Sequence, residues 1–287
     1  MEKPLINKLA IIGVGLMGGS LALALREKGE VAEVVGIGRG LPNLEEAKAL
    51  RIIDSYTQNI MEGVRGADVV IVATPVGSIV DIIAENQKHM KDGAIITDVG
   101  SVKGEIVEGV DRVLDDRLHF VGGHPIAGTE KSGASAAFPG LYRGSRCILT
   151  PTQKTDKAAL DKVLRMWQAA DADVIVMETK EHDKILAAIS HLPHMVAYAL
   201  VNTVDGVRDF EEGILKYSAG GFKDFTRIAS SSPEMWRDIC LMNRAAVIDM
   251  IDRFTAQLGD IRDMVEEGDN PGLLENFERS KQARDSL

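Results

Sequence analysis

The chain has 287 residues, of which 45% are hydrophobic and 26% are charged, a composition typical of a globular protein of about two domains. Its formal net charge of −10 opposes non-specific binding to nucleic acid or anionic membranes, because both require a basic surface. Cys147 and Cys240 are too few for a disulfide scaffold or a four-cysteine zinc site. With no signal peptide and no run of about 20 apolar residues expected, these features favour a cytoplasmic protein without a nucleic-acid or membrane partner.

Short apolar runs alternate with helical periodicity through the first half of the chain. The predicted strands span residues 9–12, 31–37, 69–73, 94–97, 119–121, 147–150 and 174–177. Strands that alternate with helices indicate βαβ units, so we predict an α/β domain with a Rossmann-like, doubly wound and mainly parallel sheet.

The pattern changes after residue 178. Ile185, Ile189, Leu192 and Val196 recur at three- and four-residue spacing along one predicted helix, and no strand signal follows. We therefore predict a dinucleotide-binding domain over residues 1–178 and an all-α domain over residues 179–287. Several apolar helix faces predict that this second domain packs against the first domain and against a second subunit, which makes a homodimer. Pro193 is expected to interrupt its first helix.

A glycine-rich turn follows the first predicted strand and opens a helix. Residues 13–18 read G-V-G-L-M-G and fit the G-x-G-x-x-G fingerprint of dinucleotide sites. The first glycine permits the tight turn, the second lets a pyrophosphate approach the backbone, and the third allows close packing of helix on strand. The predicted cofactor-binding residues of this turn are Gly13, Gly15, Leu16, Met17 and Gly18.

The end of the second predicted strand bears on the choice of cofactor. An NAD site usually carries Asp or Glu about 20 residues after the glycine turn, whereas this chain has Gly38 and Arg39. Arg39 favours NADP, because a guanidinium can bind the 2′-phosphate; NAD stays open, because the same side chain can stack on adenine. Thr74 and Pro75, after the strand predicted at 69–73, are expected to border the nicotinamide ribose.

Four further segments carry polar side chains in an unusual order. They are D-V-G-S-V-K at 98–103, G-G-H-P-I-A-G-T-E at 122–130, S-H-L-P-H at 190–194 and G-G-F-K-D-F-T-R at 220–227. With the glycine turn they resemble the monofunctional prephenate and arogenate dehydrogenases of tyrosine biosynthesis, over residues 8–257. The resemblance implies oxidative decarboxylation of prephenate to 4-hydroxyphenylpyruvate and CO2, with hydride transfer to NAD(P)+. The alternative substrates are arogenate, or both compounds as in a cyclohexadienyl dehydrogenase. The sequence does not decide between them, because a single contact could distinguish the pyruvyl side chain of prephenate from the alanyl side chain of arogenate.

His124 and Ser101 each follow a predicted strand, at the edge where ligands bind in doubly wound sheets. A histidine with an ordinary pKa near ~6.5 can accept a proton near neutrality. The resemblance implies that His124 takes the proton of the ring hydroxyl while Ser101 orients both groups. It also implies that Arg227, from its own or a neighbouring subunit, grips a substrate carboxylate. The full set of expected substrate-binding residues is Thr129, Glu130, His194, Arg227, Gly220 and Asp224.

Other polar and aromatic residues receive plainer interpretations. His191 and His194 are three apart on one helix, but a metal site lacks a third ligand, so we expect no metal. Lys103 is interpreted as a surface charge and Trp236 as core.

Two other functions fit a dinucleotide-binding domain joined to a helical one, or the glycine turn alone. A β-hydroxyacid dehydrogenase would be expected to carry a catalytic lysine on the interdomain helix, whereas here Lys184 lies early in that helix and residues 190–194 occupy its middle. A non-catalytic dinucleotide sensor would leave His124 and Arg227 without a purpose.

Overall fold

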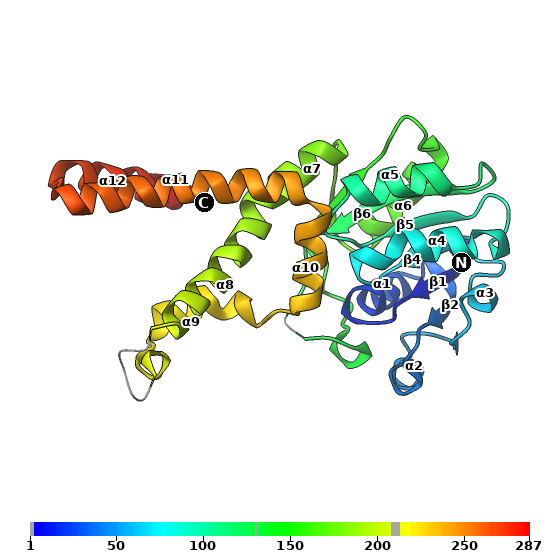
Figure 1. The fold of residues 1–287 in the computed structure, drawn as a ribbon. Helices are drawn as coiled ribbons and strands as arrows, with labels where there is room; N and C mark the ends of the chain where they lie inside the picture. Colours follow the sequence, from blue (N-terminus) through cyan, green and yellow to red (C-terminus); the bar gives the residue numbers. More distant parts are fainter. Residues whose placement is uncertain (1–2, 130, 208–212) are drawn as a thin grey trace.

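The computed structural model describes residues 3–129, 131–207 and 213–287. It has two parts: a sheet with helices on both faces, and an elongated helical part that extends away from it (Figure 1). The polypeptide crosses from one part to the other after strand β8 (Asp173–Val176) and enters helix α7 (Thr179–Leu186).

The sheet has eight strands in the order β3-β2-β1-β4-β5-β6-β7-β8. Before β8, the strands are β1 (Ile6–Ile12), β2 (Val31–Ile37), β3 (Ser55–Thr57), β4 (Val69–Val72), β5 (Ile95–Asp98), β6 (His119–Pro125) and β7 (Arg146–Thr150). All pairs are parallel except β6 with β7. The prediction of a doubly wound, mainly parallel sheet is therefore confirmed. The sequence analysis missed β3, because its three residues are partly exposed and show no apolar run.

Both faces of the sheet are covered, and its strands are apolar on both sides for this reason. Along β1, Leu9 and Ile11 face one core cluster while Ala10 and Ile12 face another. The first cluster includes residues of α1 (Leu16–Glu27) and α6 (Lys157–Ala169), and the second those of α4 (Ile79–Asn86) and α5 (Gly104–Val113). The shorter helices α2 (Leu41–Ala49) and α3 (Ile60–Gly63) flank β3.

The second part is entirely helical in its described residues. Five π-helical residues, Ala187–His191, join α7 to α8 (Leu192–Asp205). The interruption predicted at Pro193 takes this form, because proline donates no backbone hydrogen bond and its ring clashes with the preceding turn. The remaining helices are α9 (Gly220–Thr226), α10 (Pro233–Met242), α11 (Arg244–Glu267) and α12 (Asn270–Asp285).

Helix α10 ties the helical part to the sheet. Trp236 and Ile239 are buried in the second core cluster, and α10 packs against the short 3-10 helix Val76–Ser78 that follows β4. Trp236 is thus a core residue, as predicted.

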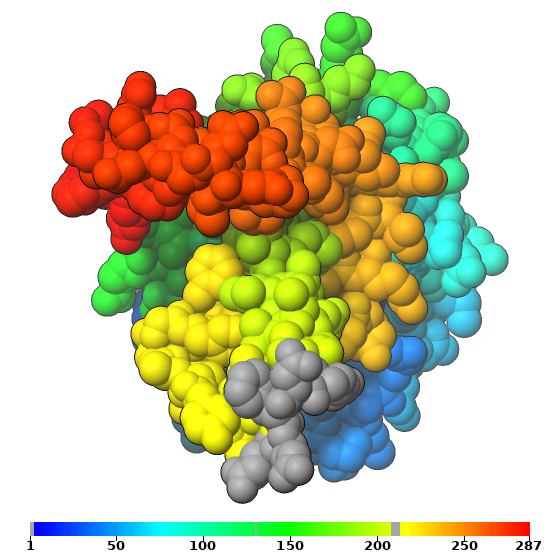
Figure 2. Space-filling model, turned by 60° about the vertical axis from the view of Figure 1, so that its left-hand side comes forward, coloured from blue at the N-terminus to red at the C-terminus, as the bar shows by residue number. Residues whose placement is uncertain are grey.

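Helix α8 remains largely uncovered by its own chain (Figure 2). Within the continuous helical stretch Thr179–Asp205, a window of 18 residues has a mean hydropathy of 1.4. By length and composition alone this stretch would suit a membrane span, and only 22% of the window is buried. Facing residues of α8 and α11 line an apolar groove of about 500 Å³, among them Val196, Leu200, Ile251 and Phe254. Such a surface needs a cover, and a second protein surface is the simplest one.

Candidate active site

The three glycines of the turn after β1 meet different surroundings. A Cβ on Gly13 would lie 2.5 Å from the Ala73 carbonyl oxygen, and its φ of +95° is one that other residues rarely adopt. A Cβ on Gly18 would lie 2.6 Å from Cγ2 of Ile11, so helix and strand pack closely there. A Cβ on Gly15 would meet nothing within 4 Å. The fold itself therefore requires Gly13 and Gly18, whereas Gly15 faces open space.

This open space lies at the N-terminus of α1. Gly15 is the N-cap and offers no side chain to the first N–H groups of the helix, which begins with Leu16 and Met17. A helix N-terminus without a side-chain cap attracts anions, so these residues fit the pyrophosphate of a dinucleotide. Thr74 lies beside Gly13, with its methyl carbon 3.3 Å from that Cβ position, and Pro75 follows it on the surface. The cofactor-binding residues predicted from the glycine turn and the end of β4 thus share one edge of the sheet.

Arg39 is exposed just after β2. Its carbonyl accepts a hydrogen bond of 2.5 Å from Nε2 of Gln58, which holds the backbone. Among the described residues, the guanidinium has no hydrogen-bond or ion-pair partner. Gly38 and Gly40 flank it, so no carboxylate stands at this strand end.

His124 lies near the carboxyl end of β6 and is only 8% exposed. Its Nδ1 is 2.8 Å from Nε2 of His182, and Nδ1 of His182 is 2.8 Å from Oδ1 of Asp183. Asp183 in turn accepts hydrogen bonds from the backbone N–H groups of Lys103 and Gly104, at 2.9 and 2.8 Å, where α5 begins. His182 and Asp183 belong to α7, so this chain of contacts joins the helical part to the sheet.

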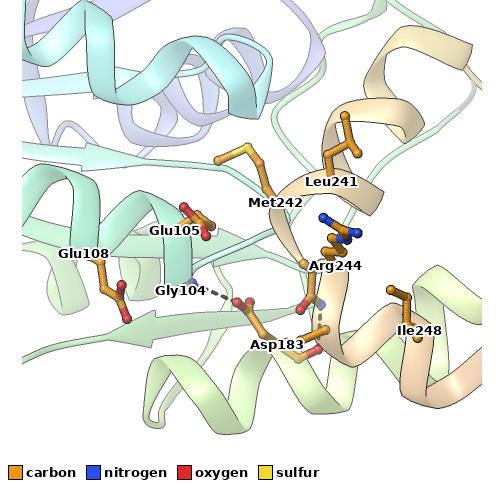
Figure 3. Close-up of a pocket in the computed structure, with 10 residues that line it drawn as sticks. Gly104, Glu105, Glu108, Asp183, Leu241, Met242, Arg244 and Ile248 are labelled. Carbon is orange, nitrogen blue, oxygen red and sulfur yellow. Dashed lines mark hydrogen bonds between the residues drawn. The ribbon is translucent and has the colours of Figure 1, made fainter.

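The Asp183 carboxylate also borders a groove of about 470 Å³ between α5 and the α10–α11 corner (Figure 3). Figure 3 shows the carboxylate directed at Gly104, with Glu105 and Glu108 on the α5 side and Arg244 opposite. The Asp183 side chain is 12% exposed, so this end of the chain of contacts also reaches solvent.

A second set of contacts holds the backbone just before His124. The Asp98 carboxylate accepts the N–H of Gly123 at 3.1 Å, and Nζ of Lys103 donates to the Gly123 carbonyl at 2.8 Å. Lys103 and Asp98 form an ion pair with both side chains fully buried. The interpretation of Lys103 as a surface charge was wrong, because the ion pair and the carbonyl together satisfy its ammonium group inside the protein.

Burial sets the protonation of the histidines. It lowers the pKa of His124 well below its usual value, and the neighbouring His182, Lys103 and His191 lower it further. The expectation of an ordinary pKa for His124 is therefore corrected: the imidazole is neutral at pH 7 and ready to accept a proton. Burial likewise lowers the pKa of His191 to about 4. His191 contacts the Asn243 side chain at 3.2 Å.

His194 and Arg227 lie together on the helical side. The His194 ring stacks on Trp236 with 3.7 Å between centroids, and its Nδ1 lies 2.9 Å from the Ser190 carbonyl. Because a carbonyl only accepts, Nδ1 carries the proton and Nε2 is an acceptor in the neutral ring. Burial lowers the pKa of His194 despite that bond, and the nearby charge of Arg227 lowers it too. His194 donates to a substrate only when it is protonated.

The other predicted residues are distributed unevenly. Ser101 follows β5, but within the described residues the hydrogen-bond partner of the His124 ring is His182 rather than Ser101. Thr129 is exposed beyond β6 and its hydroxyl accepts the N–H of Lys131 at 3.2 Å, while Glu130 lies outside the described residues. Gly220 and Asp224 lie on α9, which packs against α8 away from the sheet (Figure 1).

Sequence reasoning missed His182, Asp183 and the buried role of Lys103. The pair His182–Asp183 stands in a polar segment, E-H-D-K, that resembles any solvated helix start. Only its position after the last predicted strand hinted that it would meet the sheet edge.

Two family models match the chain. One, described as the prephenate dehydrogenase nucleotide-binding domain, matches residues 21–176, and the other, described as the prephenate dehydrogenase dimerization domain, matches residues 178–279. A prephenate dehydrogenase of Bacillus subtilis is 39% identical over 98% of this chain and 76% of its own length. A cyclohexadienyl dehydrogenase of Zymomonas mobilis is 35% identical over 97% of this chain and 95% of its own.

Solved structures of a prephenate and an arogenate dehydrogenase also superpose on this chain. Prephenate dehydrogenase from Aquifex aeolicus, in complex with hydroxyphenyl propionate and NAD+, superposes with a TM-score of 0.91 at 39% identity and covers 98% of both chains. Synechocystis arogenate dehydrogenase superposes with a TM-score of 0.82 at 28% identity, over 97% of this chain and 99% of its own. A Mycobacterium tuberculosis 3-hydroxyisobutyrate dehydrogenase shares only the fold, with a TM-score of 0.55 at 13% identity over 88% of this chain and 94% of its own.

Proposed function

Because the chain belongs to the prephenate dehydrogenase family, we propose that it converts prephenate to 4-hydroxyphenylpyruvate and CO2 in tyrosine biosynthesis, with NAD(P)+ as oxidant. The observation that carries this proposal is the position of His124: a neutral, nearly buried imidazole at the same sheet edge as a dinucleotide-type glycine turn. Ligands of doubly wound sheets bind at this edge.

In the proposed reaction, the ring carbinol loses two hydrogens, one as a proton and one as a hydride, and the quaternary carbon loses its carboxylate as CO2. The hydroxyl proton passes to Nε2 of His124, and the hydrogen on the carbinol carbon leaves as hydride. The bond to the ring carboxylate then breaks and CO2 departs. The electron pair of that bond completes the aromatic ring, and the former carbinol oxygen takes back the proton from Nε2 of His124 to become the phenol hydroxyl. The bound nicotinamide supplies the hydride acceptor. Residues of this chain would orient the carbinol carbon toward that acceptor and keep water from the imidazole.

The charged and polar residues of the helical part would bind the two carboxylates of the substrate. Arg227 is suited to a bidentate contact with one carboxylate, and His194 beside it would donate from Nε2 to a carboxylate only in its protonated form. Ser101 and Thr129 are proposed to contact the substrate from the sheet side, and Glu130, outside the described residues, is kept as a proposed substrate-binding residue. Gly220 and Asp224 lie away from the sheet in the single chain, so we propose that α9 serves the site of a second subunit.

For the cofactor, we propose NADP, bound by Gly13, Gly15, Leu16, Met17 and Gly18, with Arg39 on the 2′-phosphate and with Thr74 and Pro75 near the nicotinamide ribose. The absence of a carboxylate at residues 38–40 supports it. The Aquifex aeolicus relative was crystallised with NAD+, so NAD is the competing cofactor.

A second candidate substrate is arogenate, which differs from prephenate in its side chain. Similarity to a cyclohexadienyl dehydrogenase and to an arogenate dehydrogenase supports it. We also propose that the protein is a cytoplasmic homodimer, with the dinucleotide-binding domain over residues 1–178 and the helical substrate and dimerisation domain over residues 179–287. The match of residues 178–279 to a dimerization domain supports this arrangement.

The deciding experiment follows reduced-cofactor absorbance with prephenate and with arogenate, each tried with NAD+ and with NADP+. Turnover of prephenate, fastest with NADP+, is the expected result. A strong preference for NAD+ would contradict the role given to Arg39, and no turnover with either substrate would contradict the proposed function.

A further inference from the structure

We propose that His182 and Asp183 are positioning residues, which hold His124 in the tautomer with its proton on Nδ1 and its lone pair on Nε2. The catalytic consequence rests on the proposed function, because a base is needed only if a hydroxyl is oxidised. The tautomer itself is a property of the free protein.

Asp183 decides which group donates in each of the hydrogen bonds that link it through His182 to His124. Its Oδ1 and Oδ2 accept the backbone N–H groups of Lys103 and Gly104. Burial raises the pKa of Asp183, but the hydrogen bonds from His182 and from these two N–H groups outweigh it and leave the pKa below its ordinary value. An ionised carboxylate only accepts, so Nδ1 of His182 must be the donor in the 2.8 Å contact.

The second step concerns His182. Burial lowers its pKa, so the ring carries one proton at neutral pH, and Asp183 already holds that proton on Nδ1. Nε2 of His182 is therefore an acceptor. The 2.8 Å contact with Nδ1 of His124 then requires His124 to donate, which leaves Nε2 of His124 with a free lone pair.

The same arrangement stabilises His124 after it has taken a proton. The imidazolium still donates from Nδ1 to His182, and the negative charge of Asp183 lies beyond. This is the logic of a serine-protease triad, in which a carboxylate fixes the tautomer of the base, extended here by one more imidazole.

The geometry also couples the base to domain docking. His182 and Asp183 lie on α7 of the helical part, whereas His124 and Gly104 belong to the sheet domain. The Asn243 amide, at the start of α11, donates to the Asp183 carbonyl at 2.8 Å and so holds α7 in place. The base adopts its reactive tautomer only when the two parts are packed together.

The first test needs no substrate. In the ¹⁵N-labelled wild-type protein, the nitrogen shifts and couplings of the His124 ring should report a proton on Nδ1 and none on Nε2 at pH 7. A proton on Nε2 of His124 in the wild-type protein would overturn the proposal, whatever the enzyme turns over.

The second test compares two substitutions. His182→Leu removes the acceptor, and kcat should fall about 10²-fold or more, while KM and cofactor affinity stay near wild-type. His182→Gln places an amide oxygen near the position of Nε2, so it should recover part of kcat and the wild-type tautomer signature. His119→Gln is the matched control, because His119 opens the same strand at its opposite end.

These outcomes separate the two proposals. A wild-type kcat in a folded His182→Leu variant would overturn the positioning role. If the wild-type protein shows the expected tautomer but turns over neither prephenate nor arogenate, the proposed function is contradicted. The positioning of the His124 tautomer by His182 and Asp183 is then still supported.

Discussion

At the scale of single residues, His124 has one ring nitrogen engaged by His182 at 2.8 Å and the other directed away from that contact. His124→Asn keeps an amide nitrogen near the position of Nδ1 and removes the base. We expect turnover to fall by roughly 10²–10⁴-fold with dinucleotide affinity unchanged, measured by steady-state kinetics and cofactor titration. Unchanged turnover would remove His124 from its role.

The same residue predicts the pH dependence. Only the neutral imidazole can accept a proton, and burial lowers the pKa of His124 well below 6.5. As pH falls, activity is therefore lost only in the acid range below 6.5, and kcat/KM should be flat across neutrality. A profile that declines with a midpoint at or above 6.5 would show that the base is another group.

Arg227 is the second residue with a separable role. The positive charge of Arg227 lowers the pKa of His194, and Arg227 is exposed in the single chain. Arg227→Ala should raise the substrate KM by about tenfold or more, since a charge-assisted contact to a carboxylate contributes roughly 1.5–3 kcal/mol. Arg227→Lys should recover part of the affinity. A KM equal to wild-type in the alanine variant would rule out a contact with the substrate carboxylate.

At the scale of the element, the glycine turn offers a matched pair of substitutions. Gly18→Ala places a Cβ 2.6 Å from Ile11 and should lower the free energy of unfolding by about 1–3 kcal/mol. Gly15→Ala meets no protein atom within 4 Å and should leave that free energy nearly unchanged. It should instead weaken dinucleotide binding about tenfold or more, or ~1.4 kcal/mol.

Thermal or denaturant unfolding and cofactor titration measure the two effects separately. If Gly15→Ala binds dinucleotide as tightly as wild-type, the open space beside Gly15 is not where the cofactor lies.

Elements were predictable to different degrees. Val31–Ile37 is β2 to the residue, because a β-branched run bounded by polar and glycine residues leaves little choice. The antiparallel direction of β7 was not predicted, since an apolar run has the same composition in either direction. The chemistry of proline predicts an interruption of the helix near Pro193, but it does not predict that the interruption is π-helical.

At the scale of the whole molecule, the open apolar groove between α8 and α11 predicts self-association. Ile251 is 38% exposed in this groove, and Leu258 is 49% exposed. Ile251→Glu should convert the proposed dimer to monomer, because an unpaired carboxylate cannot be buried in an apolar interface. Sedimentation equilibrium measures the change, with Ile185→Glu, on an exposed site outside the groove, as the control. A wild-type monomer, or a dimeric Ile251→Glu variant, would contradict this use of the groove.

Residue order alone predicted the alternating sheet domain, the glycine turn, the helical second part and the place of His124 at a strand end. These follow from local periodicity and from residue types that few positions tolerate. Tertiary structure alone decided that Lys103 is buried beside Asp98, that His182 meets His124 from 58 residues away, and that Gly220 and Asp224 lie apart from the sheet. The physical reason is that such contacts depend on how α7, α8 and α9 pack, and packing joins residues whose separation along the chain carries no period.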